Sequence, residues 1–236
     1  MSNPYFQFKK FTIRHDKCAM KVGTDSVLLG AWVPVFGRSV LDIGCGTGIL
    51  SILLASRVPD LAIYAVDIDA SAVEQTMENA HNTPWGKQIT AQTIDIRKWE
   101  STQLFDTILS NPPFYPEQTL PPSEQRSLAR NTCSLNYREL VECVVNHLSP
   151  DGLFSVILPI SSEMIFRGLA VEYGLHPVRS LTVTTVEGKM PKRILMAYTL
   201  QNISSFEEKQ TLCIRNSSGD YSSEYRQLVG DYYLKL

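Results

Sequence analysis

One segment limits what this chain can fold into more than any other. Residues 40–48 read Val-Leu-Asp-Ile-Gly-Cys-Gly-Thr-Gly, and the apolar run 49–55 follows directly. Glycines let a backbone turn tightly and let a ligand approach it closely. A strand, a glycine loop and a helix in this order predict a βα unit of a mostly parallel sheet. The start of such a helix also offers backbone N–H groups to a carboxylate or a phosphate.

Four polar residues stand where successive strand-like runs end: Asp42, Asp67, Asp95 and Asn111. Ligands of open α/β sheets bind at the carboxyl ends of the strands, so we expect these side chains to surround one ligand. Asp42 suits a cationic amino group, Asp67 suits ribose hydroxyls, and Asp95 is placed to accept an adenine amine. The glycines fall as GxGxG rather than GxGxxG, which disfavours a dinucleotide-dependent dehydrogenase.

The tetrapeptide Asn-Pro-Pro-Phe at 111–114 indicates the chemistry of the site. The Asn111 side chain and the Pro112 carbonyl are acceptors, and the two prolines hold the turn rigid. Phe114 adds a flat apolar face, and Tyr115 is a candidate second face. Acceptors beside an aromatic plane suit a planar group that bears an NH₂, either a nucleobase amine or a side-chain amide. We expect Asn111, Pro112 and Phe114 to be catalytic.

The 236 residues and 44% hydrophobic content predict one α/β domain. Its expected parts are N-terminal strands and a helix (1–34), the core sheet (35–200), and a C-terminal strand and helix (201–236). No run of 18 apolar residues predicts a membrane span, and no signal-peptide pattern is present. Scattered cysteines without a CxxC pair indicate reduced thiols in a cytoplasmic protein. The histidines do not cluster with them, so no metal site is expected.

Hydrophobic patterns and turn signals predict the individual elements. Residues 1–23 are expected to form short strands, and Thr24 to cap a helix over 25–33. The connection 112–134 is long enough to be functional. Strands are expected at 39–43, 61–67, 89–94, 105–110, 152–158, 178–186, 193–200 and 210–215, and helices at 48–57, 70–81, 136–147, 161–173 and 222–230.

Residues 40–200 resemble the S-adenosylmethionine (AdoMet)-dependent methyltransferases in their glycine loop and strand-end acids. NPPF after the fourth strand is similar to enzymes that methylate adenine N6, guanine N2 or a glutamine amide. The ends of the chain narrow the resemblance to the bacterial tRNA(Val) adenine-N6 methyltransferases. The segments that carry it are FKKF at 8–11, CAMKVGTD at 18–25, LLGAW at 28–32, YSSEY at 221–225 and DYYL at 231–234.

This resemblance implies a Rossmann-like class I fold: a mostly parallel seven-stranded sheet with a C-terminal antiparallel hairpin and helices on both faces. It implies AdoMet as the cofactor and methyl transfer to N6 of the adenosine 3′ of a tRNA anticodon. It also implies a cofactor site made by Lys21, Thr24, Asp42, Gly44, Gly46, Gly48, Asp67, Ile68, Asp95, Ile96 and Asn111.

Other substrates fit the same tetrapeptide. A protein glutamine-amide methyltransferase is disfavoured, because such enzymes usually carry an N-terminal helical domain and too few residues precede Asp42 for one. An rRNA guanine-N2 methyltransferase is the nearer alternative, although those enzymes often carry a duplicated upstream domain. A non-catalytic RNA-binding relic is disfavoured because the motif residues are all present.

The net charge of −2 does not by itself indicate nucleic-acid binding. Basic residues nevertheless gather near the N-terminus, after NPPF and near residue 190. The expected partner is a tRNA, bound by a monomer with no membrane partner. Its expected contacts are Lys9, Lys10, Arg14, Lys17, Arg130 and Lys192.

Overall fold

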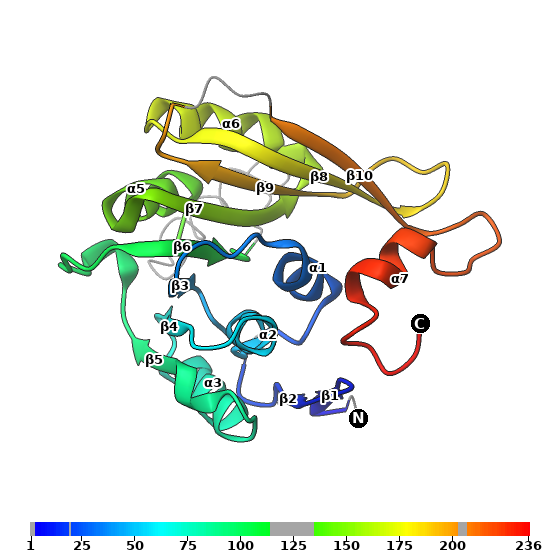
Figure 1. The fold of residues 1–236 in the computed structure, drawn as a ribbon, viewed down its shortest axis with the longest axis horizontal. Helices are drawn as coiled ribbons and strands as arrows, with labels where there is room; N and C mark the ends of the chain where they lie inside the picture. The colour runs from blue at the N-terminus through cyan, green and yellow to red at the C-terminus, as the bar shows by residue number, and fades with distance from the viewer. Residues whose placement is uncertain (1–2, 19, 114–134, 203–206) are drawn as a thin grey trace, which may run out of the picture.

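A computed structural model describes residues 3–18, 20–113, 135–202 and 207–236. Within these ranges the chain forms an eight-stranded sheet with the order β10-β8-β9-β7-β6-β3-β4-β5, and a separate two-stranded hairpin (Figure 1). The strands of the large sheet are β3 (Ser39–Ile43), β4 (Ala62–Asp67), β5 (Ile89–Thr93), β6 (Phe105–Ser110), β7 (Leu148–Pro159), β8 (His176–Val186), β9 (Arg193–Thr199) and β10 (Glu208–Arg215).

The helices of the described chain cover both faces of this sheet. They are α1 (Thr24–Trp32), α2 (Ile49–Arg57), α3 (Ala70–His81), α5 (Tyr137–His147), α6 (Glu163–Glu172) and α7 (Ser223–Val229), with 3₁₀ turns at Gly86–Gln88, Ile96–Lys98 and Ile160–Ser162. One buried cluster lies between the sheet and α1, α2 and α7, and a second lies between the sheet and α5 and α6. No helix in the described ranges is long and apolar enough to cross a membrane.

The pairing of the strands places the predicted acids side by side. β3 lies between β4 and β6 and runs parallel to both, so these three strands end at the same edge of the sheet. β5 extends the parallel part beyond β4, while β9 runs antiparallel to β7 and β8. The mostly parallel sheet with a late antiparallel hairpin is therefore confirmed.

The described sheet has eight strands where seven were expected. The additional strand is β10, which pairs in parallel with β8 at the edge of the sheet. The sequence pattern predicts a strand at 210–215, but alternation of side chains carries no information about which neighbour the strand joins. In the structure α7 follows β10 and packs against both β10 and α1.

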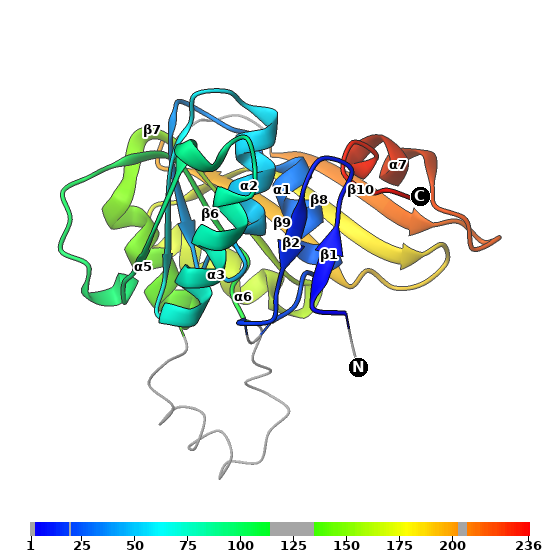
Figure 2. The same ribbon diagram turned by 90° about the horizontal axis from the view of Figure 1, so that it is seen from below.

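The N-terminal hairpin and the C-terminal segment lie on the same side of the sheet as α1 (Figure 2). The hairpin consists of β1 (Tyr5–Gln7) and β2 (Thr12–Arg14), which pair antiparallel as expected. Phe8 forms a bridge with Tyr233, and the Lys9 amide donates to the carbonyl oxygen of Tyr232 at 2.8 Å. The motifs near the two termini are thus parts of one packed unit.

Helix α1 begins one residue earlier than expected. Gly23, in an extended conformation, occupies the N-cap position, and no side chain caps the helix. Thr24 is therefore the first helical residue and not the cap. β7 is also longer than expected, because the chain is already extended at Leu148, directly after α5.

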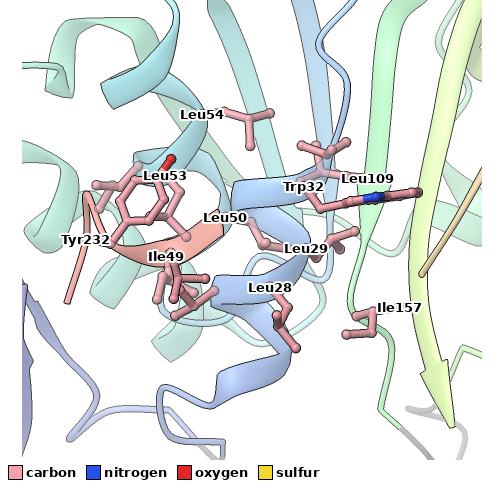
Figure 3. Close-up of a cluster of buried hydrophobic side chains, with 14 of the residues drawn as sticks. Leu28, Leu29, Trp32, Ile49, Leu50, Leu53, Leu54, Leu109, Ile157 and Tyr232 are labelled. Atoms are coloured by element: carbon pink, nitrogen blue, oxygen red, sulfur yellow. The ribbon is translucent and has the colours of Figure 1, made fainter. Parts of the chain in front are cut away.

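The contact between α1 and α2 forms the centre of the first buried cluster (Figure 3). Figure 3 shows α1 between α2 and the sheet: the Trp32 ring points toward the strands that carry Leu109 and Ile157, and α2, seven of whose nine residues are buried, lies on the other side of the helix. The two helices are close at Gly30, where an added Cβ would lie 2.5 Å from Cδ1 of Leu53. Glycine is needed at this position for space, and not for its backbone angles.

We expect Gly30→Ala to destabilise the fold by about 1–3 kcal/mol, because overpacking outweighs the better helix propensity of alanine. Gly168→Ala in α6 is the matched control, since its Cβ would meet no atom within 4 Å. That variant should be more stable by about 0.4–1 kcal/mol. Urea unfolding of both variants measures the difference, and equal effects would contradict the close approach of α1 and α2.

Candidate cofactor and substrate site

A cavity of about 330 Å³ lies at the carboxyl ends of the parallel strands, within the usual size range of small-molecule sites. We call it the glycine-loop cavity. Its described walls come from the glycine loop, from the segments after β4, β5 and β6, and from the stretch before α1. The main wall residues fall in 43–47, 66–69, 94–97, 110–113 and 20–22, with Cys18 and Ser26. The sheet edge is the one that the sequence predicts.

The glycine loop has the backbone that only glycine adopts easily. Gly44, Gly46 and Gly48 have φ angles of 75°, 54° and 75°. A Cβ on Gly44 or Gly46 would meet no atom within 4 Å, so open space lies beside both residues. The amides of Gly44 and Cys45 both donate to the carbonyl oxygen of Val66, at 2.8 and 3.1 Å, which fixes the loop to the end of β4.

Asp42 lies beneath this loop and not in the wall of the cavity. Its side chain is fully buried, and Oδ2 accepts hydrogen bonds from the amide and the hydroxyl of Ser51 at 3.2 and 2.7 Å. The carboxylate thus accepts a hydrogen bond from an N–H group in the first turn of α2, where negative charge is favourable. Asp42 bonds this turn from below and is not part of the described cavity wall, and its predicted role toward a ligand stays a prediction.

Burial raises the pKa of Asp42 to about 6, against the opposing effect of the Ser51 hydrogen bonds. The second carboxylate oxygen, Oδ1, has no hydrogen-bond partner among the described residues. The ionised carboxylate is therefore only half satisfied by its surroundings. This cost is the reason why its protonated form is favoured at a higher pH than usual.

Asp67 is held in the cavity wall by two backbone amides. Oδ2 accepts from Gly46 at 3.0 Å, and Oδ1 accepts from Asp69 at 3.0 Å. Each carboxylate oxygen keeps a further lone pair for a ligand hydroxyl. Ile68, which is 42% exposed, follows directly and presents an apolar surface at the same wall.

Asp95 also lies in the wall, but it is already paired. Arg97 makes a bidentate contact with it, from Nε to Oδ1 at 2.7 Å and from Nη2 to Oδ2 at 2.8 Å. These hydrogen bonds lower the pKa of Asp95 in spite of its partial burial. Arg97 lines the cavity as well and was missed from the sequence. Ile96 is buried between the two polar residues and completes this part of the wall.

Asn111 and Pro112 directly follow the end of β6 and lie in the cavity wall. Nδ2 of Asn111 donates to Oγ of Ser26 at 2.9 Å, whereas its Oδ1 is buried without a partner among the described residues. The structure therefore supplies an acceptor at the point where the sequence places one. Phe114, Tyr115 and Arg130 lie outside the described residues.

Helix α3 holds the glycine loop through a buried polar face that sequence reasoning missed. The Thr76 hydroxyl donates to the carbonyl oxygen of Gly46 at 2.9 Å, and Nδ2 of Asn79 donates to that of Thr47 at 2.9 Å. Asn79 also accepts from the amide of Arg14, which ties the N-terminal hairpin to the site. The available signal was a polar stripe on an otherwise amphipathic helix: Gln75, Thr76 and Asn79.

The remaining predicted cofactor residues are divided between wall and support. Lys21 lines the cavity. Thr24 does not, and its side chain interacts with Tyr233 of the C-terminal segment. Gly48 does not line the cavity either. It faces α3, since an added Cβ would lie 2.8 Å from Cγ2 of Thr76.

The predicted basic contacts do not converge on the cavity. Lys10 lines a separate hollow together with Trp32 and Arg57, which end α1 and α2 at the opposite edge of the sheet. Lys9, in the same hairpin turn, donates to the carbonyl oxygen of Gly230 at 2.6 Å. These two lysines do not border the cavity, because charge density in the sequence does not show which end of a hairpin faces the site, and their contact with RNA stays a prediction.

Lys17 and Lys192 lie nearer to the predicted edge. The ammonium of Lys17 forms ion pairs with Glu74 and Glu78 at 2.7 and 2.6 Å. The carbonyl oxygen of Lys192 accepts from Ile160, just beyond the end of β7, and its side chain is exposed. Arg14 is exposed in β2. Lys192 is thus the predicted contact whose position best suits a ligand at this edge.

Comparisons with known proteins agree with this architecture. A family model described as methyltransferase small domain matches residues 18–157. A tRNA1(Val) (adenine(37)-N6)-methyltransferase of Bacteroides fragilis is 43% identical over 240 residues, which cover 100% of both chains. A relative of the same name from Escherichia coli O157:H7 is 40% identical over 97% of this chain and 94% of its own.

Solved structures share the fold at low sequence identity. A crystal structure described as a predicted O-methyltransferase from Agrobacterium tumefaciens has a TM-score of 0.66 and 13% identity, and covers 88% of this chain and 96% of its own. A glycopeptide N-methyltransferase complexed with AdoMet has a TM-score of 0.55 and 13% identity, with coverages of 77% and 90%. At such identities the likeness concerns the fold alone.

The sheet order and the glycine loop at its edge define a class I AdoMet-dependent methyltransferase. Within that class, the chain belongs to the family of the bacterial tRNA(Val) adenine-N6 methyltransferases.

The buried Asp42 leads to a prediction about pH. Its folded pKa of about 6 lies above the unfolded value, so the folded state holds the proton more tightly and stability falls as pH rises through this window. Asp42→Asn removes the titration. We expect the variant to gain stability relative to the wild type between pH 4.5 and 7, by on the order of 1–3 kcal/mol.

Asp106→Asn is the control, because its expected effect on the free energy of unfolding has the opposite sign. Despite desolvation, hydrogen bonds from Ser39 and Arg38 lower the pKa of Asp106, so its ionised form stabilises the fold. That stability is present above the unfolded pKa, and the variant should lose stability at neutral pH. Chemical unfolding at several pH values measures both. If the free energies of unfolding of the wild type and of Asp42→Asn change with pH in parallel, Asp42 does not titrate in this window.

Proposed function

We propose that this protein transfers the methyl group of AdoMet to N6 of the adenosine 3′ of a tRNA anticodon, the substrate position that its relatives' names give. The observation that carries the proposal is Oδ1 of Asn111, a buried acceptor without a described partner, in the wall of the glycine-loop cavity. Such an atom is costly to leave unbonded unless a ligand supplies the donor. An exocyclic NH₂ is a donor of the required kind.

The described walls suit the cofactor. The space beside Gly44 and Gly46 admits a ligand close to the backbone, and Asp67 is placed to accept from ribose hydroxyls. Ile68 and Ile96 offer apolar surface for an adenine ring. Lys21 adds a cation at the wall formed by the N-terminal segment, where a ligand carboxylate would be favoured. These assignments are proposals, and they support AdoMet more than a dinucleotide.

The chemistry asked of the protein is positioning. AdoMet, when bound, supplies a methyl group that is already activated by its sulfonium charge. Asn111 and the Pro112 carbonyl would accept hydrogen bonds from the substrate NH₂. These bonds would turn the nitrogen lone pair away from the ring and toward the incoming methyl group. No general base is needed, because the methylated nitrogen is a strong acid and loses its proton afterwards. Alignment of this kind supplies much of the rate of such reactions.

A tRNA loop suits this arrangement better than a paired helix. The amine must leave its pairing edge before it can enter the cavity, which costs little for an unpaired base. Phe114 is proposed to stack on that base, with Tyr115 as a second face. The proposed RNA contacts are Lys192, Arg14, Lys17 and Arg130, with Lys9 and Lys10 farther from the site.

We further propose that the chain acts in the cytoplasm as a monomer with a single domain. The support is that α7 packs against β10 and α1, and that the N-terminal hairpin packs against the C-terminal segment. Size-exclusion chromatography with light scattering tests the monomer, and limited proteolysis tests the single domain.

The defining experiment is incubation with labelled AdoMet and unmodified tRNA, followed by nucleoside analysis. We expect N6-methyladenosine in the anticodon loop. Label recovered as N2-methylguanosine, or in protein, would overturn the substrate while leaving the family intact.

Asn111→Ala should lower kcat by about 10²–10³, because a preorganised polar contact at the reacting centre is lost. AdoMet affinity, measured by calorimetry, should change little. Asn82→Ala is the control, since that amide is exposed at the end of α3. Wild-type activity in Asn111→Ala would reduce Asn111 to a turn residue.

Lys192→Ala should weaken tRNA binding and reduce the slope of log affinity against log salt concentration by about 0.7–0.9, the value of one lost phosphate contact. Lys87→Ala is the matched control, since Lys87 is exposed just before the start of β5, at the sheet edge opposite the cavity. Affinity measured between 50 and 200 mM salt distinguishes them. If Lys87→Ala has the larger effect, the RNA crosses the other edge of the molecule.

A further inference from the structure

One hydrogen bond near the proposed acceptor connects two distant parts of the chain. Nδ2 of Asn111 donates to Oγ of Ser26 at 2.9 Å, across 85 positions in the sequence. Both residues line the glycine-loop cavity. Ser26 belongs to the first turn of α1, whereas Asn111 follows the end of β6. The bond therefore fixes an end of β6 to the start of α1.

The orientation of an asparagine amide depends on such partners. Its oxygen and its nitrogen are nearly equal in shape, so rotation by half a turn exchanges an acceptor for a donor. In this structure the NH₂ group is occupied by Ser26, and the oxygen is the atom that remains without a described partner. The reverse orientation would present a donor to the substrate amine, which is itself a donor. Only one orientation can assist the reaction.

We propose that Ser26 is a positioning residue, which holds the Asn111 amide with its oxygen available to the substrate NH₂. This inference rests on the proposed function and assigns a role within the same site. Ser26 acts through Asn111 and does not need to touch the substrate. Its hydroxyl oxygen is the acceptor that the amide NH₂ requires.

The position of Ser26 is itself fixed by the residues beside it. Oδ2 of Asp25 accepts from Nε of Arg193 at 2.7 Å, which ties the first turn of α1 to the start of β9. Val27 on the other side is fully buried in the first core cluster. The serine hydroxyl is therefore presented from a held backbone, which a device for orientation needs.

Helix stability does not account for serine at this position. Gly23 is the N-cap, and no side chain caps α1. Serine has a lower helix propensity than alanine, so alanine would suit the helix at least as well. The competing explanation is that Ser26 binds the cofactor directly, since it lines the cavity.

Steady-state kinetics and calorimetry separate these explanations. For Ser26→Ala we expect kcat to fall by about 10–100-fold, as for loss of part of a preorganised contact, with AdoMet Kd within about twofold of the wild type. Ser26→Thr keeps the hydroxyl and should recover most of kcat. Ser223→Ala, in the first turn of α7 and paired with Glu224, should leave kcat unchanged.

The double variant gives the sharper result. If Ser26 acts through Asn111, Ser26→Ala should have almost no further effect on kcat in an Asn111→Ala background, because the amide that it orients is gone. Additive losses would overturn the proposal, and so would a weakened AdoMet Kd with unchanged kcat. A wild-type protein that forms no N6-methyladenosine would instead refute the proposed function, independently of the variants.

Discussion

The site depends on how the glycine loop is attached to the sheet. The amides of Gly44 and Cys45 donate to one carbonyl at the end of β4, and the amide of Gly46 donates to Asp67. These bonds require left-handed backbone angles that side chains with a Cβ rarely adopt. The end of β4 thereby fixes the loop, the loop fixes the start of α2, and the cavity forms beside it.

The support for this loop is mostly polar and mostly buried. Asp42 holds the first turn of α2 from below, while Thr76 and Asn79 of α3 hold loop carbonyls from the side. Buried polar groups that are bonded specify one arrangement more strictly than apolar packing does. The exception is the second oxygen of Asp42, which has no partner among the described residues, and burial raises the pKa of this carboxyl group to about 6.

The catalytic side of the cavity is built by a different means. Asn111 comes from the end of β6, but its orientation depends on Ser26 of α1, and α1 is held by Arg193 and by its packing on α2. The N-terminal and C-terminal segments pack on each other beside this helix. Of the motifs near the termini, the segment before α1 lines the cavity with Cys18 and Lys21, whereas the FKKF and C-terminal motifs do not line it and support it through their packing.

The parallel sheet and the edge at which the site lies can both be predicted from the sequence. Short segments carry the signals for them: strand periodicity, glycine spacing and a polar residue at or near the end of each strand. The sequence also predicted the acceptor at Asn111. Three-dimensional contacts were needed to show that Asp42 bonds Ser51 beneath the loop, that Arg97 pairs with Asp95, and that Lys9 and Lys10 lie away from the cavity. Each of these depends on contacts between residues distant in sequence or on side-chain direction, which neither composition nor spacing specifies.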